Sequence, residues 1–574
     1  MYEYAHVHVD VTECTGVYRP WLFVNVHVLV HVHIHVSSSL EFLMRVASVT
    51  IALWASTIAS PLLAQDRFNG LAGGPYDRLV IRNVMVIPGH GGPPAGPYDV
   101  VIRQNVIDQL TPFDPVSAER RADQQRATGD RIIDGTGKFL MPGMIDLHMH
   151  LRTEPMENEY VDYLKLAHGI TSFVPAPDRG LDSALIRQKA SQENRILAPR
   201  YFPIWGWGRG YARAEAEDPA QAPRIAREMV ANGAHVVSVG NVTWSQELFG
   251  AVCKAVWEAG GITTIHLPPS TNAVVNAVDA ARLGVTMIEH HYGYAESSLD
   301  RSVQDFPRTY AYDDENARFR AAGHVWVEAG TNPETRARLL AQVADSLVAY
   351  GVTMLPTRVV YEANRDIIRA TSLPWHEKYT HQALIDWNLP NPAYHGSYHY
   401  DWTSDDEAWW TYAFRLWGDL IFEFNKRGGR IAYGTDDNYI WATPGFSNIR
   451  ELQLLRESGM HNLEVIKAAT LNSAQTLRQP KLGLVRPGYL ADLVLVDGNP
   501  AYNLRFLYSF GALRLDPQRE MIRTAGIVHT IKDGIVVENA RIMEEVARMV
   551  AHSKQGVSAN VESEPFISNG RGGR

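Results

Sequence analysis

The chain has 574 residues, enough for several ordinary domains or for one large α/β barrel with additions. Its hydrophobic content of 45% and charged content of 20% are typical of a globular protein, and the net charge of −9 without a basic stripe argues against nucleic acid as a partner. The two cysteines, Cys14 and Cys253, are too far apart in sequence for a disulfide framework or a thiolate metal site.

The first segment, residues 1–43, contains an alternating histidine and valine run and is predicted to be a non-native or disordered extension, with a histidine-rich metal tract as the alternative. From Met44, a short positive start, an apolar run over 46–58 and small residues before Gln65 predict a signal peptide over 44–64. The protein is therefore expected to be exported, as a periplasmic or secreted protein. The apolar run is short for a membrane span, and no later segment reaches the required length of ~20 apolar residues, so no stable membrane anchor is expected.

Short strand-like runs separated by turn residues fill 77–140, and runs of the same character return over 479–545. These two segments predict one composite β-sandwich domain, formed from both chain ends and flanking a central unit. The tail, residues 553–574, is rich in Ser, Gly and Asn and is predicted to be disordered.

The central unit, residues 141–478, alternates apolar strand-like runs with helical stretches, which is typical of parallel βα repeats. Glycine follows several of the helical stretches, where it would close the helix. Eight units predict a (β/α)8 TIM-like barrel. An insertion at about 359–417 is rich in Trp and Tyr, most of which we expect in a subdomain core and some in the substrate pocket. The predicted strands are 144–150, 170–175, 200–205, 235–239, 262–266, 286–290, 352–355 and 431–434.

His148 and His150 are one strand period apart, so both side chains face the same side of the first strand. Further metal-ligand residues stand at the ends of later strands: His266, His290 and Asp436. The carboxyl ends of barrel strands meet at one face, so these five residues predict a metal site. Imidazole and carboxylate ligands without thiolates suit Zn²⁺ or another divalent first-row metal.

A divalent ion in such a site lowers the pKa of a bound water to about 7 and polarises a carbonyl. Asp436 is placed to accept the proton of that water and to pass it to a leaving nitrogen. The expected reaction is hydrolysis of a carbon–nitrogen bond in a small-molecule, amide-type substrate. Asp436 and His290 are the predicted catalytic residues.

The segment 142–150, the Glu-His pair ending at His290, the Gly-Thr-Asp ending at Asp436 and the segment 484–500 together resemble the amidohydrolase superfamily, notably its imidazolonepropionase and prolidase-like branch. The resemblance covers about residues 77–540. It implies a barrel with a composite β-sandwich and hydrolysis of C–N bonds with one or two divalent metals. It also implies that His148, His150, His266, His290 and Asp436 form the metal site, with Asp436 as the general base.

Two positions depart from the family pattern. Many members with two metal ions carry a carboxylated lysine in the fourth strand, where this chain has Ser238, so one ion is expected rather than two. Members of the deaminase type carry a glutamate where this chain has Pro269. These departures motivate an alternative function, a non-catalytic binding or assembly protein that keeps the fold.

Three residues near the predicted strand ends are candidates for substrate contact: His291, Arg358 and Tyr361. For His291 a structural role is the default alternative. The sequence leaves the substrate, the native metal and homo-oligomerisation open.

Overall fold

The computed structural model describes residues 67–114, 116–117, 126–151, 156–176, 181–240, 245–267, 275–298, 315–330, 333–393 and 396–555. The segments 1–43 and 44–64, most of the tail and Pro269 lie outside these ranges. Within the described ranges, no helix combines the length and the apolar character that crossing a membrane requires.

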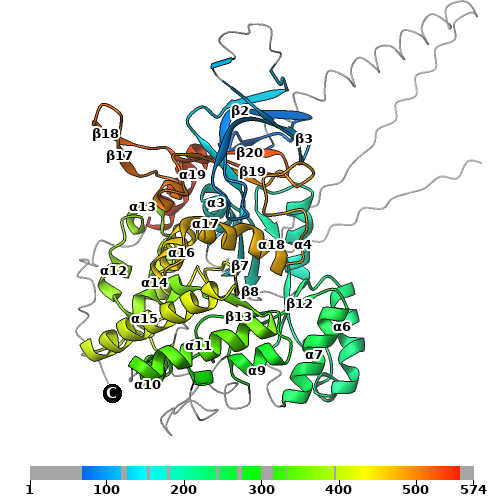
Figure 1. The fold of residues 1–574 in the computed structure, drawn as a ribbon, viewed down its shortest axis with the longest axis vertical. Coiled ribbons are helices and arrows are strands. Elements are labelled where there is room, and N and C mark those ends of the chain that lie inside the picture. The colour runs from blue at the N-terminus through cyan, green and yellow to red at the C-terminus, as the bar shows by residue number, and fades with distance from the viewer. Residues whose placement is uncertain are drawn as a thin grey trace, which may run out of the picture. The chain divides into compact units, whose positions relative to one another are not determined.

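A nine-stranded sheet draws its strands from the two ends of the described chain (Figure 1). Its order is β1-β20-β19-β16-β6-β2-β3-β4, with β5 paired to β2. The two ends meet in two antiparallel pairs, β1 with β20 and β6 with β16. The strands are β1 (Ala72–Gly73), β2 (Arg78–Val86), β3 (Ala95–Arg103), β4 (Val106–Pro112), β5 (Arg131–Asp134), β6 (Phe139–Pro142), β16 (Leu493–Asp497), β19 (Gly526–Lys532) and β20 (Ile535–Glu538).

One face of this sheet has its own hydrophobic core. Residues two apart in a strand share a face, and the pairs Leu79/Ile81, Val100/Ile102 and Leu493/Leu495 all belong to one buried cluster. Val, Ile and Leu at alternate positions therefore explain why the two ends of the chain pair.

Each of the eight segments predicted as parallel strands overlaps a strand of the structure, so the presence of these strands is confirmed. Three strands form the sheet β7-β8-β9, six form the sheet β10-β11-β12-β13-β14-β15, and every pairing in both is parallel. The strands are β7 (Met144–His150), β8 (Ile170–Ala176), β9 (Arg200–Tyr201), β10 (Ile204–Gly206), β11 (Val236–Ser238), β12 (Ile262–Ile265), β13 (Met287–Glu289), β14 (Thr353–Leu355) and β15 (Arg430–Ile431).

Backbone hydrogen bonds continue past the ends of these two sheets. The amide of Leu147 in β7 donates to the carbonyl of Tyr433 at 2.9 Å, just after β15. The amide of Phe202, between β9 and β10, donates to the carbonyl of Phe173 in β8 at 3.0 Å. Strand β7 is thus bonded to β8 on one side and to the segment after β15 on the other.

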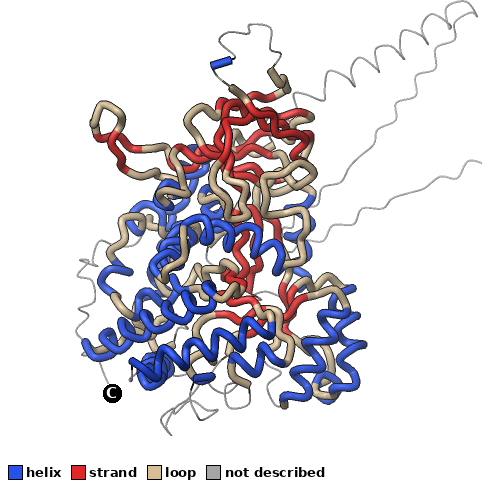
Figure 2. The backbone as a smooth tube through the Cα atoms, viewed as in Figure 1, coloured by secondary structure: helices blue, strands red, loops and turns tan. Residues whose placement is uncertain are grey.

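Helices alternate with the parallel strands along the chain (Figure 2). Glycines at the predicted helix ends take positive φ, such as 76° at Gly169 and 69° at Gly351, which glycine adopts without steric cost. The main helices are α3 (Asn158–Ala167), α4 (Leu181–Gln192), α6 (Ala222–Ala231), α7 (Gln246–Glu258), α9 (Ala277–Arg282), α10 (Glu315–Gly330), α11 (Pro333–Tyr350), α16 (Phe446–Glu457), α17 (Asn462–Lys467) and α18 (Ser473–Thr476).

The described part of the aromatic-rich segment, residues 359–417, is mainly helical. It holds most of the 3-10 turn η3 (Arg358–Asn364), then α12 (Ile367–Thr371), α13 (His376–Tyr379), α14 (Gln382–Asn388) and much of α15 (Ser404–Lys426). Helix α15 begins with a capping box of Thr403 and Asp406 and packs against α10 and α11. Trp375, Tyr398 and Trp410 are buried, as core aromatics are.

The described chain ends differently from the prediction. The last strand ends at Glu538, and α19 (Asn539–Ser553) takes residues that the sequence assigned to the β-sandwich and to the start of the tail. Ile542, Val546 and Val550 recur every four residues and are buried, and α19 packs against α3. This helical period in the segment after β20 was the missed signal.

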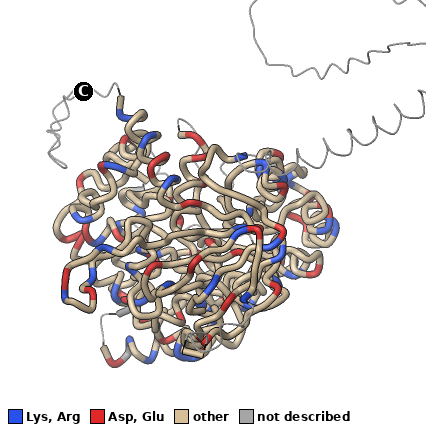
Figure 3. Tube along the Cα trace, turned by 90° about the horizontal axis from the view of Figure 1, so that it is seen from above, with Lys and Arg blue, Asp and Glu red and all other residues tan. Residues whose placement is uncertain are grey.

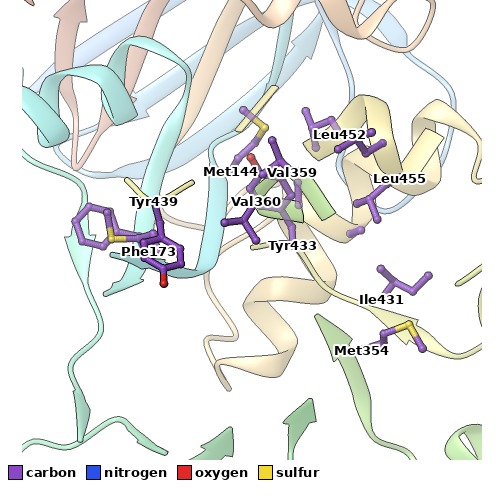
Figure 4. Close-up of a cluster of buried hydrophobic side chains, with 14 of the residues drawn as sticks. Met144, Phe173, Met354, Val359, Val360, Ile431, Tyr433, Tyr439, Leu452 and Leu455 are labelled. Atoms are coloured by element: carbon purple, nitrogen blue, oxygen red, sulfur yellow. The ribbon is translucent and has the colours of Figure 1, made fainter. Parts of the chain in front are cut away.

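A large core joins the helices to the parallel strands, and Figure 4 shows part of it around Met144, Val360 and Tyr433. Positions of acidic and basic residues are interspersed along the described chain in the view of Figure 3. This mixture agrees with the absence of a basic stripe in the sequence.

Candidate metal centre

The end of β7 and the segment after β15 are held together by their backbones. The carbonyl of His148 accepts hydrogen bonds from the amides of Thr435 at 3.0 Å and Asp436 at 2.7 Å, and the amide of His150 donates to the carbonyl of Asp437 at 3.1 Å. A Cβ on Gly434 would lie 3.1 Å from the amide nitrogen of His148, so glycine permits this close approach. His148, His150 and Asp436 are therefore fixed relative to one another.

The carboxylate of Asp436 lies at the centre of three imidazoles. Its Oδ1 is 3.1 Å from Nε2 of His148 and 2.9 Å from Nε2 of His150, and its Oδ2 is 3.6 Å from Nδ1 of His290. Asp436, His148 and His290 are buried. Four of the five predicted ligands thus meet around one carboxylate.

His266, the fifth predicted ligand, lies next to this group. Its ring packs edge to face against the ring of His290, with 4.7 Å between the ring centroids. Among the described residues, two groups have ligand atoms that all lie within 4.8 Å of one another, namely His148/His150/Asp436 and His148/Glu289/His290, and neither includes His266.

Glu289 is a member of the site that the sequence analysis missed. Its Oε1 lies 3.1 Å from Nδ1 of His148 and accepts a hydrogen bond from the hydroxyl of Thr264 at 2.5 Å. Neighbours in a regular strand face opposite sides, but β13 ends at Glu289 and His290 has a φ of 62°. The turn brings both side chains to the site, and the adjacent Glu-His pair was the only signal in the sequence.

Three strand ends at this site turn through residues with positive φ that are not glycine: His290 at 62°, Thr357 at 50° and Asp436 at 54°. Such conformations cost about 1–3 kcal/mol each and cluster at functional sites. The hydroxyl of Thr357 lies 2.7 Å from Nδ1 of His290 and fixes the orientation of that ring.

The donor atoms fit a cation. Nδ1 of His148 and Oδ1 of Asp436 are buried and make no hydrogen bond of acceptable geometry among the described residues, although charged partners lie close to both. Short contacts without hydrogen-bond alignment are expected of atoms that share a metal ion. Imidazoles and carboxylates without thiolates are the ligands of Zn²⁺ and similar ions.

The electrostatics of the site also favour a cation. Burial lowers the pKa of His290 to about 4, and burial together with His290 holds the pKa of His266 well below its usual value. Burial alone would raise the pKa of Asp436, but His290 and His148 hold it well below its usual range. Burial opposes the charge on His148, yet Glu289 and Asp436 raise its pKa well above the usual value. Two ionised carboxylates therefore stabilise positive charge between them.

A buried polar network lies behind the ligands. The ammonium of Lys165 in α3 donates to Asp146 at 2.8 Å, to Asp437 at 2.6 Å and to the side-chain oxygen of Asn448 at 2.9 Å. Asp146 also accepts from the amide of His148 at 3.2 Å. All three donors of Lys165 are used, so this lysine is not available as a carbamate bridge.

The predicted substrate-binding residues lie in three different environments. His291 is buried among Tyr292, Tyr361, Trp410 and Trp417, which agrees with a structural role. The ring of Tyr361 packs edge to face against the ring of His290, with 5.8 Å between the ring centroids.

Arg358 is engaged in structural contacts instead of the substrate contact expected from the sequence. It stacks on Phe414, donates to the carbonyl of Phe414 at 2.8 Å and bonds Ser458. The left-handed turn at Thr357 directs the chain into η3, and the guanidinium points to α15 and α16.

The sequence profile of the amidohydrolase family matches residues 423–537, which include Asp436. Adenine deaminase 2 of Rhizobium etli is 28% identical over 178 residues, which are 29% of this chain and 29% of that protein. An adenine deaminase of Geobacillus kaustophilus is 33% identical over 96 residues, 16% of each chain. The chain thus matches less than a third of the length of these curated relatives.

Two solved structures share the fold. A Xaa-Pro dipeptidase with bound methionine has a TM-score of 0.52 at 18% identity and covers 80% of this chain and 100% of its own. Bottromycin amidohydrolase has a TM-score of 0.55 at 15% identity and covers 86% of this chain and 94% of its own. Fold and site define a mixed α/β protein with a candidate metal centre at the ends of its parallel strands. The match of residues 423–537, the adenine deaminase relatives and the solved structures of similar fold together support the amidohydrolase superfamily.

Proposed function

We propose that the protein is a metal-dependent hydrolase that cleaves a carbon–nitrogen bond, in an amide or cyclic amide other than an ordinary protein peptide bond. The observation that carries the proposal is the position of the Asp436 carboxylate, buried and 2.9–3.6 Å from His148, His150 and His290. The family match and the similar proteins, which are an adenine deaminase, a Xaa-Pro dipeptidase and an amidohydrolase, support the reaction class.

We infer that the two parallel sheets are parts of one closed (β/α)8 barrel. Two backbone bonds support this closure. The bond from Leu147 to Tyr433 joins β7 to the segment after β15, and the bond from Phe202 to Phe173 pairs β8 with the segment that leads from β9 directly into β10. In such a barrel the carboxyl ends of all strands meet at one face, where the catalytic groups gather. The nine-stranded sheet is then the composite domain formed by both chain ends.

We assign His148, His150, His290 and Asp436 as ligands of a divalent cation, with His266 beside them and Zn²⁺ as the metal that these donors suit. The bound cation supplies a lowered pKa for a water molecule and polarisation of the scissile carbonyl. The hydroxyl of Thr357 holds the ring of His290 in position, and Nδ1 of that ring lies 3.6 Å from Oδ2 of Asp436.

Asp436 is the proposed general base. Its carboxylate stays ionised because His290 and His148 hold its pKa well below the usual range, so it can accept a proton from the attacking water. It then delivers that proton to the leaving nitrogen, which departs as an amine or as ammonia. One carboxylate thus serves both proton transfers.

The test is Asp436→Asn, assayed on a panel of N-acyl amino acids, dipeptides, cyclic amides and adenine, together with metal analysis of the same samples. General acid–base catalysis contributes typically 10²–10⁴-fold, so we expect a loss of about that size. Asp345→Asn, on the surface of α11, is the matched control. A wild type that binds metal but hydrolyses none of the panel with any divalent ion would favour the alternative, a non-catalytic binding or assembly protein.

Export of the protein remains our proposal, because the segment 44–64 lies outside the described residues. Its check is the location of a tagged full-length chain and the N-terminal sequence of the exported form. A start at Gln65 is the expected result.

A further inference from the structure

The ring of Tyr439 stacks on the ring of His150. Their centroids are 5.5 Å apart, and their planes differ by 24°. His150 is the most exposed of the proposed ligands, with 18% of its side chain accessible against 9% for His148 and 3% for His290. Strand β7 ends at His150, so packing from outside the strand is needed to limit the rotation of this ring.

The backbone of Tyr439 is fixed by a tight turn directly after the site. The amide of Asn438 donates to the carbonyl of Ala442, and the amide of Ala442 donates to the carbonyl of Tyr439, each at 2.9 Å. Ile440 and Trp441 have φ values of 42° and 61°, and a positive φ is an outlier for a β-branched residue such as Ile. Such conformations persist only where the surroundings over-determine them, so the turn presents Tyr439 in one orientation.

A glycine of the aromatic-rich segment lies against the ring of Tyr439. A Cβ on Gly396 would be 2.5 Å from Cε2 of Tyr439 and 2.9 Å from its Cζ, and the φ of Gly396 is 91°. Glycine is the residue that permits both this approach and this φ without strain. The ring of Tyr439 is thus in contact with His150 and with the backbone at Gly396.

The segment after this glycine also reaches the support of a second ligand. Nε2 of His399 lies 3.2 Å from the side-chain oxygen of Asn364, and the hydroxyl of Tyr398 donates to the same oxygen. Asn364 ends η3, the turn that begins just after Thr357, and the hydroxyl of Thr357 contacts the ligand His290. One segment therefore contacts the residues that support two of the proposed ligands.

We propose that Tyr439 is a positioning residue that holds the ring of His150 in its metal-binding orientation, and that the aromatic-rich segment sets the position of Tyr439 through Gly396. This inference rests on the proposed function, because it takes His150 as a ligand. The stacked geometry suits the role, since a cation bound to His150 places positive charge on the imidazole, and positive charge is attracted to the face of an aromatic ring. The segment inserted between β14 and β15 thus acts on the metal centre through packing.

The experiment measures the Zn²⁺ affinity of the purified full-length chain by competition with a chromogenic chelator, for wild type, Tyr439→Leu and Tyr439→Phe. Loss of a partner that orients a ligand histidine typically costs about 10–100-fold in metal affinity, and we expect Tyr439→Leu to bind Zn²⁺ more weakly by about that factor. Tyr439→Phe keeps the stacked ring and should keep the wild-type affinity. The visible spectrum of the Co²⁺-loaded protein reports the geometry of the ligands, and it should shift in Tyr439→Leu but not in Tyr439→Phe.

Gly396→Ala tests the contact with the aromatic-rich segment. Its methyl group pushes the ring of Tyr439 out of place, so Zn²⁺ binding should weaken. Gly428→Ala is the matched control, since Gly428 also has a positive φ, 81°, but a Cβ there meets nothing within 4 Å. In the Tyr439→Leu background, Gly396→Ala should have little further effect on Zn²⁺ affinity, because its effect passes through the ring.

Equal Zn²⁺ affinity and equal Co²⁺ spectra in wild type and Tyr439→Leu overturn the inference and leave the proposed function intact. Equal weakening by Tyr439→Phe and Tyr439→Leu also overturns it, because the hydroxyl and not the stacked ring would then hold the site. Equal effects of Gly396→Ala and Gly428→Ala overturn the role of the aromatic-rich segment. Where circular dichroism shows that Tyr439→Leu does not fold, the comparison of the two glycine variants decides the inference. A wild type that binds no Zn²⁺ removes the proposed function and the inference together.

Discussion

The ammonium of Lys165 lies 2.6 Å from the carboxylate of Asp437, and neither side chain has any exposed surface. Asp437 directly follows Asp436, and the second carboxylate bound by Lys165, that of Asp146, accepts the amide of His148. One lysine of α3 therefore ties together the two backbone segments that carry the metal ligands.

Lys165→Met should destabilise the protein and weaken its metal site. Removing one partner of a buried ion pair costs about 3–5 kcal/mol because the remaining charge is left uncompensated. Here two carboxylates would be left, and they flank the ligands. The measurement is urea unfolding together with Zn²⁺ affinity.

Lys189→Met is the control for that experiment, because Lys189 is exposed. Its ammonium lies 3.9 Å from the carboxylate of Glu193, in a surface ion pair. A surface substitution of this kind usually changes stability by less than about 0.5 kcal/mol. Equal stability losses in the two variants would mean that the Lys165 network does not hold the site.

Much of the strand order could be predicted from the sequence. The runs ending at His150 and near His266 are apolar and bounded by glycine turns, so local pattern is enough to locate β7 and β12. Placement of His148, His150, His290 and Asp436 at one site followed from parallel strand ends alone. The structure brings these four together.

Thr357→Val should weaken metal binding without unfolding the protein. The hydroxyl of Thr357 is 2.7 Å from Nδ1 of His290, and valine keeps the shape but removes this bond. Loss of a partner that orients a ligand histidine typically costs 10–100-fold in metal affinity or activity. Competition with a chromogenic chelator measures the change, and Thr411→Val on the exposed side of α15 is the control. An unchanged affinity would show that the ring is held by packing alone.

Removal of the metal should lower the melting temperature. Chelation leaves the buried carboxylates of Asp436 and Glu289 without their cation, while an ion present at 100 times its Kd stabilises the folded state by about 2.7 kcal/mol. Differential scanning fluorimetry of chelated and Zn²⁺-restored protein gives the shift. His150→Ala should reduce the rise in melting temperature on addition of Zn²⁺. A wild-type melting temperature that changes neither on chelation nor on addition of Zn²⁺ would argue against a cation at this site.

Other parts of the site could not be read from the sequence, because they depend on contacts between distant segments. Lys165 meets Asp437 across 272 positions, and no local pattern distinguishes it from a surface lysine of α3. Glu289 would face away from His290 in a regular strand, so only the left-handed turn at His290 reveals it. Arg358 looked like a substrate ligand because it follows a strand, whereas its partners are set by the packing of α15 and α16.

The buried carboxyl of Glu451 in α16 should make stability fall as pH rises. Burial raises the pKa of Glu451 to about 8, although the amide of Val359 and Arg358 oppose the shift. The unfolded chain releases this proton near its usual pKa of about 4.3, while the folded chain keeps it up to about pH 8. Between pH 4.3 and pH 8, about the two pKa values, the folded state binds more protons than the unfolded state. The stabilisation from the protonated Glu451 is therefore fully present below about pH 4.3 and is lost as the pH rises to about 8. Glu451→Gln cannot titrate, and its free energy of unfolding should change less than that of wild type from pH 5 to 8.

Urea unfolding at each pH measures the slope, with Glu457→Gln from the same helix as the control. Burial alone would raise the pKa of Glu457, but the hydrogen bond from Arg365 outweighs burial and lowers that pKa. Glu457 is therefore ionised in both the folded and the unfolded state from pH 5 to 8. The free energy of unfolding of Glu457→Gln should change with pH as that of wild type does. A Glu451→Gln slope equal to that of wild type would show that this carboxyl is already ionised in the folded protein, with Arg358 as its counter-charge.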